Sequence, residues 1–269
     1  MRIGIVPMSA KPFHAGHNAL IKFAAGHELL EPLVKLGFAE QENDQVNVYV
    51  SYSSRGVKKV KDPNDPRTIK QGARKIEVPI EGESPVFGKD MEYIWDNILT
   101  PDNLQYTNTN VSIITPNMSQ VRSPVAAGFM VADAFKDAYN NNEQTWIDPI
   151  SNIVYETART IITFYCGEDD LNRYNENTMF KYYGDLYTND LINVIGIPRV
   201  VAISGTEMRE YLCSGNIEML INMLPESLSE ESKQQIADIL IKSVSCGYPS
   251  SRDIVKVESL IRNYVKLLL

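Results

Sequence analysis

The sequence predicts an α/β fold, a Rossmann-like parallel sheet with helices on both faces and a helical cap at its C-terminal end. The first observation is that short, continuous apolar runs alternate with segments of helical periodicity. A continuous run such as Arg2 to Met8 is typical of a parallel strand covered on both faces, since half-exposed strands alternate apolar and polar residues instead. The second observation is that the pattern after Arg209 is helical throughout.

These patterns predict two parts of the chain. We expect an α/β domain over residues 1–212 and a helical cap over residues 213–269. Residues 76–150 are a candidate insertion into the first part, because their beginning shows little periodicity.

Five segments are predicted to be strands, because they are apolar and rich in β-branched or aromatic residues. Pro12 ends the first of these strands and Pro198 interrupts the last, since proline lacks the backbone N–H donor that a sheet requires. In chain order the predicted strands are Arg2 to Met8, Val46 to Val50, Val111 to Thr115, Thr160 to Cys166, and a segment within Val194 to Ile203.

Helices are predicted where apolar residues recur at helical spacing. A loop from Ser51 to Pro66 is followed by a basic segment, Arg67 to Lys75, that we also expect to be helical. Proline at the first helical position supports a helix from Pro124 to Tyr139. The other predicted helices begin at Gly16 and extend toward Gly37, span Met91 to Leu99 and Ile217 to Leu224, begin at Ser229, and run from Asp253 to the C-terminus.

Composition narrows the functional classes. The formal net charge of −8 disfavours a nucleic-acid-binding protein. No apolar run approaches the ~18 residues of a membrane span, and no signal-peptide pattern is present, so we expect a cytoplasmic protein with no membrane partner. The three cysteines form no CxxC pair, so the sequence indicates no zinc site.

Two histidines mark the point where the first strand gives way to a helix. His14 and His17 would share one face of a helical turn, and Gly16 between them lets a ligand approach the backbone closely. Next to a polyphosphate each ring favours its protonated form and donates a charge-assisted hydrogen bond, to which Lys11 adds a positive charge. An isolated His-x-x-His is usually an ordinary surface or capping pair. A metal site has no visible third ligand.

A second motif follows the apolar run that ends at Ile203. Ser204 and Glu207 form a Ser-x-x-Glu capping box, which by itself only starts a helix. Thr206 and Arg209 are not needed for capping. Hydroxyl groups, the free N–H groups of a first helical turn and an arginine together suit the outer phosphates of a nucleotide, and capping and phosphate binding can coexist at one helix start.

The two motifs resemble the HxGH and SxTxxR motifs of the nucleotidyltransferase superfamily, which contains the nicotinamide-mononucleotide, pantetheine-phosphate and FAD-forming adenylyltransferases and the cytidylyltransferases. The Ser-Gly-Thr-Glu-Met-Arg form at 204–209 looks most like archaeal-type nicotinamide-mononucleotide adenylyltransferases, and is similar to cytidylyltransferase-like proteins of large tailed phages. The resemblance extends over residues 1–75 and 160–225.

The resemblance implies a role for each motif residue. A third landmark, Gly-x-Asp, matches Gly167-Glu168-Asp169, whose role would be to shape the second-substrate pocket or hold a ribose hydroxyl, although a solvated acidic turn and a role for Asp170 stay open. The implied catalytic residues are His14, His17 and Arg209, and the implied nucleotide-binding residues are Lys11, Gly16, Gly167, Asp169, Ser204, Gly205 and Thr206.

The implied reaction moves a nucleoside monophosphate from ATP or CTP to a small phosphate-bearing acceptor and releases pyrophosphate, with Mg²⁺ held mainly by the nucleotide. The most specific expectation is a nicotinamide-mononucleotide adenylyltransferase of NAD synthesis. The alternatives are a cytidylyltransferase, a pantetheine-phosphate adenylyltransferase, and a non-catalytic nucleotide-binding or phage-assembly protein that retains the site. A homo-oligomer is left open, and a phage-encoded protein would reside in the host cytoplasm.

Overall fold

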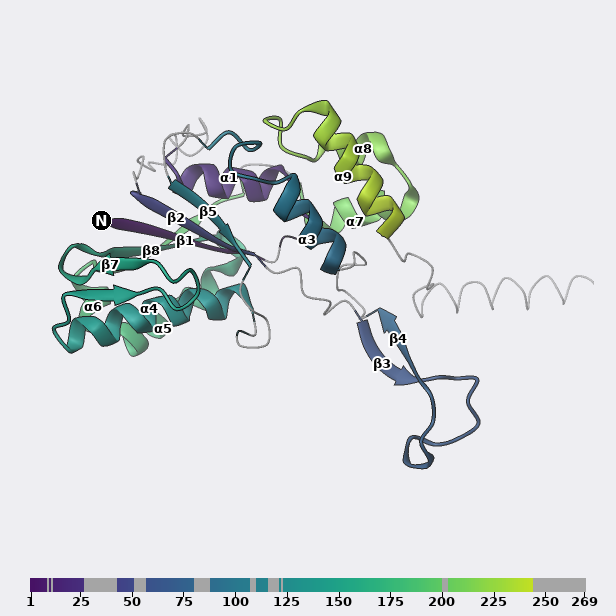
Figure 1. Ribbon diagram of the computed structural model, residues 1–269, viewed down its shortest axis with the longest axis horizontal. Helices are drawn as coiled ribbons and strands as arrows, with labels where there is room; N and C mark the ends of the chain where they lie inside the picture. The colour runs from purple at the N-terminus through teal and green to yellow at the C-terminus, as the bar shows by residue number, and fades with distance from the viewer. Residues whose placement is uncertain are drawn as a thin grey trace, which may run out of the picture.

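A five-stranded parallel sheet forms the centre of the protein (Figure 1). The computed structural model describes residues 1–8, 10, 12–26, 43–50, 57–79, 88–106, 110–115, 121, 123–199 and 203–243. The strands of the sheet are β1 (Arg2–Met8), β2 (Gln45–Val50), β5 (Asn110–Ile114), β8 (Ile161–Gly167) and β9 (Ile192–Ile197). Their order is β5-β2-β1-β8-β9, and every neighbouring pair is parallel.

The strand order creates one switch point in the sheet. The chain builds outward from β1 through β2 to β5, and then crosses to the other side of β1 to add β8 and β9. Helices that leave β1 and β8 therefore turn away from each other, and open α/β sheets bind ligands in the crevice that this leaves at the carboxyl ends of the strands.

Helices cover both faces of the sheet (Figure 1). Val6 and Met8 of β1 pack in the core on one face and Ile3 and Ile5 in the core on the other, which explains why this strand is apolar from Ile3 to Met8. The first face carries α1 (Ala15–Ala24), α3 (Gly88–Asn97), α7 (Gly205–Ser214), α8 (Ile217–Asn222) and α9 (Glu230–Ser243). The second carries α4 (Pro124–Asn140), α5 (Glu176–Tyr183), α6 (Asp185–Thr188) and the hairpin of β6 (Thr145–Ile147) and β7 (Val154–Glu156).

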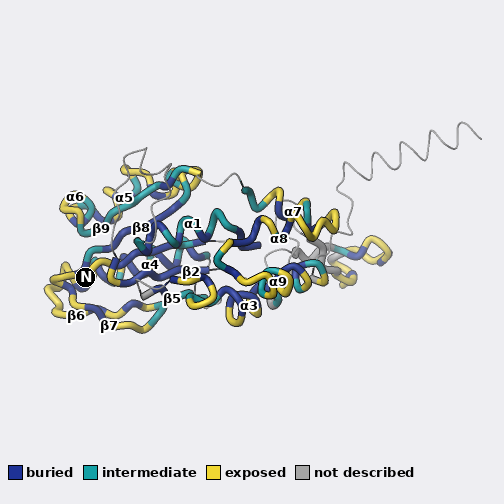
Figure 2. The backbone as a smooth tube through the Cα atoms, turned by 90° about the horizontal axis from the view of Figure 1, so that it is seen from above, coloured by how far each residue is buried: buried dark blue, intermediate teal, exposed yellow. Residues whose placement is uncertain are grey.

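The observed elements confirm the predicted fold class. The central strands β1, β2 and β8 are buried along most of their length, α4 is buried along one side, and exposed residues are concentrated at the periphery (Figure 2). Within the described residues, no helix is both long enough and apolar enough to cross a membrane. The predicted continuation of the first helix toward Gly37 and the helix from Asp253 lie outside the described residues.

One predicted helix is wrong. Instead of a helix from Arg67 to Lys75, the chain forms a single 3₁₀ turn, η1 (Ile69–Gln71), and then a strand, β4 (Lys75–Pro79). Part of the predicted loop before it is also a strand, β3 (Val57–Lys61), which pairs antiparallel with β4. The Asp65 carboxylate accepts a hydrogen bond from the Arg67 N–H, and the Gln71 side-chain oxygen accepts one from the Thr68 N–H. Such local hydrogen bonds compete with those of a helix.

The division of the chain at residue 212 stays a prediction. Within the candidate insertion, residues 110–114 supply the edge strand β5, and residues 124–140 supply α4, which packs against β1 and β2. These parts of residues 76–150 therefore belong to the sheet and to the layer that covers it.

Candidate functional site

An open cavity of about 410 Å³ lies at the carboxyl edge of the sheet. Three of the parallel strands line it with their last residues: Pro7 and Met8 of β1, Cys166 and Gly167 of β8, and Ile197 of β9. The cavity therefore spans the switch point between β1 and β8. The sequence predicts ligand binding at this edge, where both motifs follow strands.

The N-termini of α1 and α7 meet at this cavity. His14, Gly16 and His17 line it from the start of α1, and Ser204 and Gly205 line it from the start of α7. A methyl group in place of the Gly16 hydrogen would lie 3.9 Å from the backbone oxygen of Ile203. Two motifs about 190 residues apart in the sequence are thus neighbours in space.

The two histidines hold each other in a fixed orientation. His14 is the N-cap of α1, and its Nδ1 accepts a hydrogen bond from the Gly16 N–H at 3.1 Å. The Nδ1 of His17 accepts from the His14 N–H at 3.3 Å, which completes a reciprocal capping box. The ring centroids lie 3.9 Å apart, and Phe13 stacks on His17 at 5.7 Å. Because both Nδ1 atoms accept, each neutral ring carries its proton on Nε2.

Both histidines are neutral near pH 7 in the protein itself. Burial, and then the charges of Arg199 and Arg209, lower the pKa of His14 from 6.5 to about 4. Burial and the neighbouring His14 ring also hold the pKa of His17 well below its usual value. Protonation next to a polyphosphate therefore has to overcome this environment, to which Arg199 and Arg209 contribute positive charge.

The capping interpretation of the second motif is confirmed. Ser204 Oγ accepts from the Glu207 N–H at 3.1 Å and lies 2.8 Å from Glu207 Oε2, to which it donates. The Ser204 N–H donates to the same carboxylate oxygen at 2.9 Å. These bonds lower the pKa of Glu207. Ser204 therefore caps α7 and also lines the cavity.

Arg209 folds back over the start of its own helix. Its Nη2 donates to Thr206 Oγ1 at 3.0 Å, and a Cβ on Gly205 would lie 3.3 Å from its Nη1. Arg209 lines the cavity, whereas Thr206 is exposed and is not part of the lining. A cation at a helix N-terminus is opposed by the helix dipole, so this placement favours an anion between the two.

The third predicted segment forms the other side of the cavity. Gly167, Asp169 and Asp170 line it from the end of β8 and from the 3₁₀ helix η3 (Glu168–Tyr174). Asp169 pairs with Arg199 at 3.1 Å, and Asp170 pairs with Arg173 at 3.3 Å. The two carboxylates are thus distinguished by their partners, although both lie at the cavity.

The sequence argument missed Arg199 and Arg173, and Lys11 lies outside the described residues. One signal for Arg199 was its place directly after Pro198, where β9 ends at the carboxyl edge of the sheet. Arg173 lies one turn after Asp170, a common spacing for an ion pair. Among the described residues, no group of three or more His, Cys, Asp or Glu side chains is arranged to hold a metal ion.

Comparisons with known proteins add little to this geometry. No protein-family model and no curated protein matches the chain. A similar solved structure is that of TmcAL from Thermotoga maritima bound with alpha-thio ATP, with 15% sequence identity and a TM-score of 0.41. The match covers 90% of this chain and 56% of TmcAL, so the chain spans little more than half the length of that protein. At this TM-score the likeness carries no argument about function.

Proposed function

We propose that the protein is a nucleotidyltransferase that binds the triphosphate of ATP or CTP between the N-termini of α1 and α7. The single observation that carries the proposal is that both motifs line one cavity at the switch point of the sheet. The N-terminal ends of two helix dipoles and the Arg209 guanidinium converge there, and this combination suits a polyanion.

Each motif residue has a place in this proposal. His14 and His17 present their Nε2–H groups to the α- and β-phosphates, because their Nδ1 atoms are occupied as caps. Arg209, with Ser204, Gly205 and Thr206 at the start of α7, binds the β- and γ-phosphates. Lys11 is proposed to contact the triphosphate from the segment after β1. Gly16 keeps the approach to the backbone open.

The reaction requires the protein mainly to align the acceptor with the nucleotide and to stabilise the negative charge of the phosphates. An acceptor phosphate oxygen forms a bond to the α-phosphorus, and the bond from that phosphorus to the bridging oxygen breaks. The electron pair leaves with pyrophosphate. Since the acceptor phosphate is already ionised near pH 7, no general base is required. The neutral N–H donors of His14 and His17, oriented by the capping box of α1, and the Arg209 guanidinium can stabilise the charge that develops on the leaving group.

Mg²⁺ fits this site as an ion carried by the nucleotide. The nearby carboxylates of Asp169 and Asp170 are oxygen donors, but each is paired with an arginine. The described carboxylates of the cavity therefore offer no ready cage, and the phosphates would hold the metal, whose chemistry is to neutralise the charge on the departing pyrophosphate.

The acceptor is proposed to bind on the side of the cavity formed by β8 and η3. Gly167 leaves open space there, and Arg199, fixed by Asp169, offers a guanidinium to an acceptor phosphate. Nicotinamide mononucleotide is the specific acceptor we propose, in line with the form of the second motif. Cytidylyl transfer and pantetheine phosphate remain as alternatives for the same site.

Pyrophosphate release tests the proposal. The protein is incubated with Mg²⁺ and ATP or CTP, together with nicotinamide mononucleotide, nicotinate mononucleotide, phosphopantetheine, FMN or glycerol 3-phosphate in turn. Release that depends on one acceptor, and that is lost in Arg209→Ala but kept in Arg159→Ala, supports the proposal, since Arg159 is exposed in the 3₁₀ helix η2 (Thr157–Arg159) outside the cavity lining. Nucleotide binding without release would make the protein a non-catalytic binder, and the absence of binding would overturn the proposal.

A further inference from the structure

The hairpin of β3 and β4 with its connecting tip, residues 57–79, forms an arm that stands clear of the sheet and its helices (Figure 1). Its two strands pair antiparallel from Val57 opposite Pro79 to Lys61 opposite Lys75. They pair with no other strand among the described residues. The arm is therefore available to a partner.

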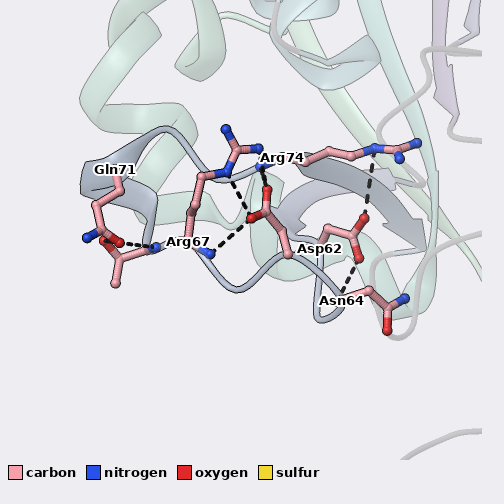
Figure 3. Close-up of polar contacts among 7 residues, drawn as sticks. Asp62, Asn64, Arg67, Gln71 and Arg74 are labelled. Carbon is pink, nitrogen blue, oxygen red and sulfur yellow. Dashed lines mark hydrogen bonds and ion pairs between the residues drawn. The ribbon is translucent and has the colours of Figure 1, made fainter.

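Polar contacts join the side chains and the backbone at the tip of the arm (Figure 3). Both of its carboxylates are turned inward, with Asp62 9% and Asp65 8% exposed. Asp65 accepts two hydrogen bonds from the Arg67 side chain, at 3.0 and 2.7 Å, and one from the Arg74 N–H at 2.6 Å. Asp62 accepts from the Asn64 N–H at 2.9 Å. These contacts give the tip a defined shape.

The cations of the tip face outward. The Arg67 side chain is 57% exposed and the Arg74 side chain 74% exposed, and Lys70 and Lys75 are exposed as well. The Arg67 guanidinium holds the pKa of Asp65 well below its usual range, so this carboxylate stays ionised within the tip. The surface of the arm is consequently positive.

Charge is strongly segregated between the arm and the rest of the chain. The arm contains seven Lys and Arg residues against three Asp and Glu residues, a formal charge of +4, so the remainder of the chain carries −12. Part of this negative charge lies on two helices that contact each other, α3 and α9. Their exposed residues include Glu92 and Asp96 on α3 and Glu231 and Asp238 on α9.

We propose that the arm binds the acidic face formed by α3 and α9 on a second copy of this chain. The argument is charge complementarity within one sequence. Around a two-fold axis, the arm of each copy would bind the α3–α9 face of the other copy, and this reciprocal contact limits the assembly to a dimer. A nucleic acid is a less suitable partner, because the −12 charge of the remaining chain repels a polyanion at long range.

Such an interface is electrostatic and therefore sensitive to salt. Exposed ion pairs contribute little individually, so several have to act together and a reversible dimer is expected. Raising the salt from about 50 mM to about 500 mM shortens the screening distance to a few ångströms and should dissociate it.

Sedimentation velocity of the full chain at about 50 μM, at both salt concentrations, tests the proposal, with charge-reversed variants to locate the interface. We expect a dimer at low salt, at least a tenfold weaker association in Lys70→Glu/Lys75→Glu, and a similar loss in Glu231→Lys/Asp238→Lys. The variant that combines all four substitutions should regain association, because the charges are exchanged and not removed.

The matched control is Lys181→Glu/Arg159→Glu, which changes the net charge equally on exposed residues outside the arm. Lys181 belongs to α5, which lies at the opposite end of the molecule from the arm (Figure 1). The control variant should dimerise like the wild type, and thermal melts should show that all variants fold. A monomer at low salt, or a dimer whose association is unchanged in Lys70→Glu/Lys75→Glu, would overturn the proposal. A monomer whose arm instead retains poly-U RNA on a filter would overturn it in favour of a polyanion partner.

Discussion

Acidification should unfold this protein partly through the histidine that caps α1. His14 is 7% exposed, and its Nδ1 accepts the Gly16 N–H, so a protonated ring would be charged in a buried place and would lose its capping bond. Because the folded pKa of about 4 lies below the usual 6.5, the unfolded chain binds this proton more readily. The contribution of His14 to stability is therefore complete above about pH 6.5 and is lost as the pH falls toward 4.

The magnitude follows from the same two pKa values. The difference between 6.5 and about 4 corresponds to about 3 kcal/mol of free energy of unfolding, of which about 2 kcal/mol is lost by about pH 4.5. His14→Asn is the matched variant, because asparagine is also a good N-cap but does not titrate. Urea unfolding of both proteins near pH 7 and near pH 4.5 gives the comparison.

The wild type should lose about 2 kcal/mol more than His14→Asn between the two pH values, since the other titrating groups are shared and only His17, whose pKa the His14 ring lowers, is affected by the replacement. Equal losses in the two proteins would refute the reasoning, and would mean that His14 is solvated or that its proton is accommodated in the folded state.

Three further predictions concern the same site. Ser204→Ala should lower the free energy of unfolding by about 1 kcal/mol in urea, because it removes the N-cap of α7, and an unchanged value would show that the box does not stabilise the helix. Gly167→Ala should leave the free energy of unfolding unchanged, because its Cβ meets no protein atom within 4 Å, yet it should weaken acceptor binding. Gly196→Ala should lower the free energy of unfolding by about 1 kcal/mol or more, because its Cβ would lie 2.4 Å from Leu171. Equal melting temperatures of the two variants would contradict this contrast. His17→Ala should lower kcat about a hundredfold with a smaller effect on nucleotide affinity, and a raised KM with unchanged kcat would assign His17 to binding alone.

Local pattern was sufficient to predict the sheet. A strand covered on both faces is typically apolar along most of its length, and β1 and β8 show this directly in the sequence, although β2 also buries Gln45 and Asn47. The start of α7 was equally predictable, because Ser204 and Glu207 form the capping box that their spacing indicates. The position of the cavity followed from the general rule for open α/β sheets.

Features that depend on distant partners were not predictable. The pairing of Arg199 with Asp169 joins residues 30 positions apart, and neither residue alone indicates the other. The low pKa of His14 arises from burial and from arginines that only the fold brings near. The basic segment after Arg67 was misread because the carboxylate of Asp65 organises it through bonds to backbone N–H groups, which helical periodicity does not register.

The central claim is that α1 and α7 jointly hold a triphosphate, with Arg209 at its outer phosphates. Calorimetric titration of the wild type and Arg209→Ala with ATP and with AMP tests it most directly, because only ATP carries the β- and γ-phosphates that Arg209 is proposed to bind. We predict that Arg209→Ala weakens ATP binding by about tenfold or more and leaves AMP binding almost unchanged, and that Arg209→Lys recovers part of the loss. Equal losses for ATP and AMP, or no binding of ATP to the wild type, would contradict the claim.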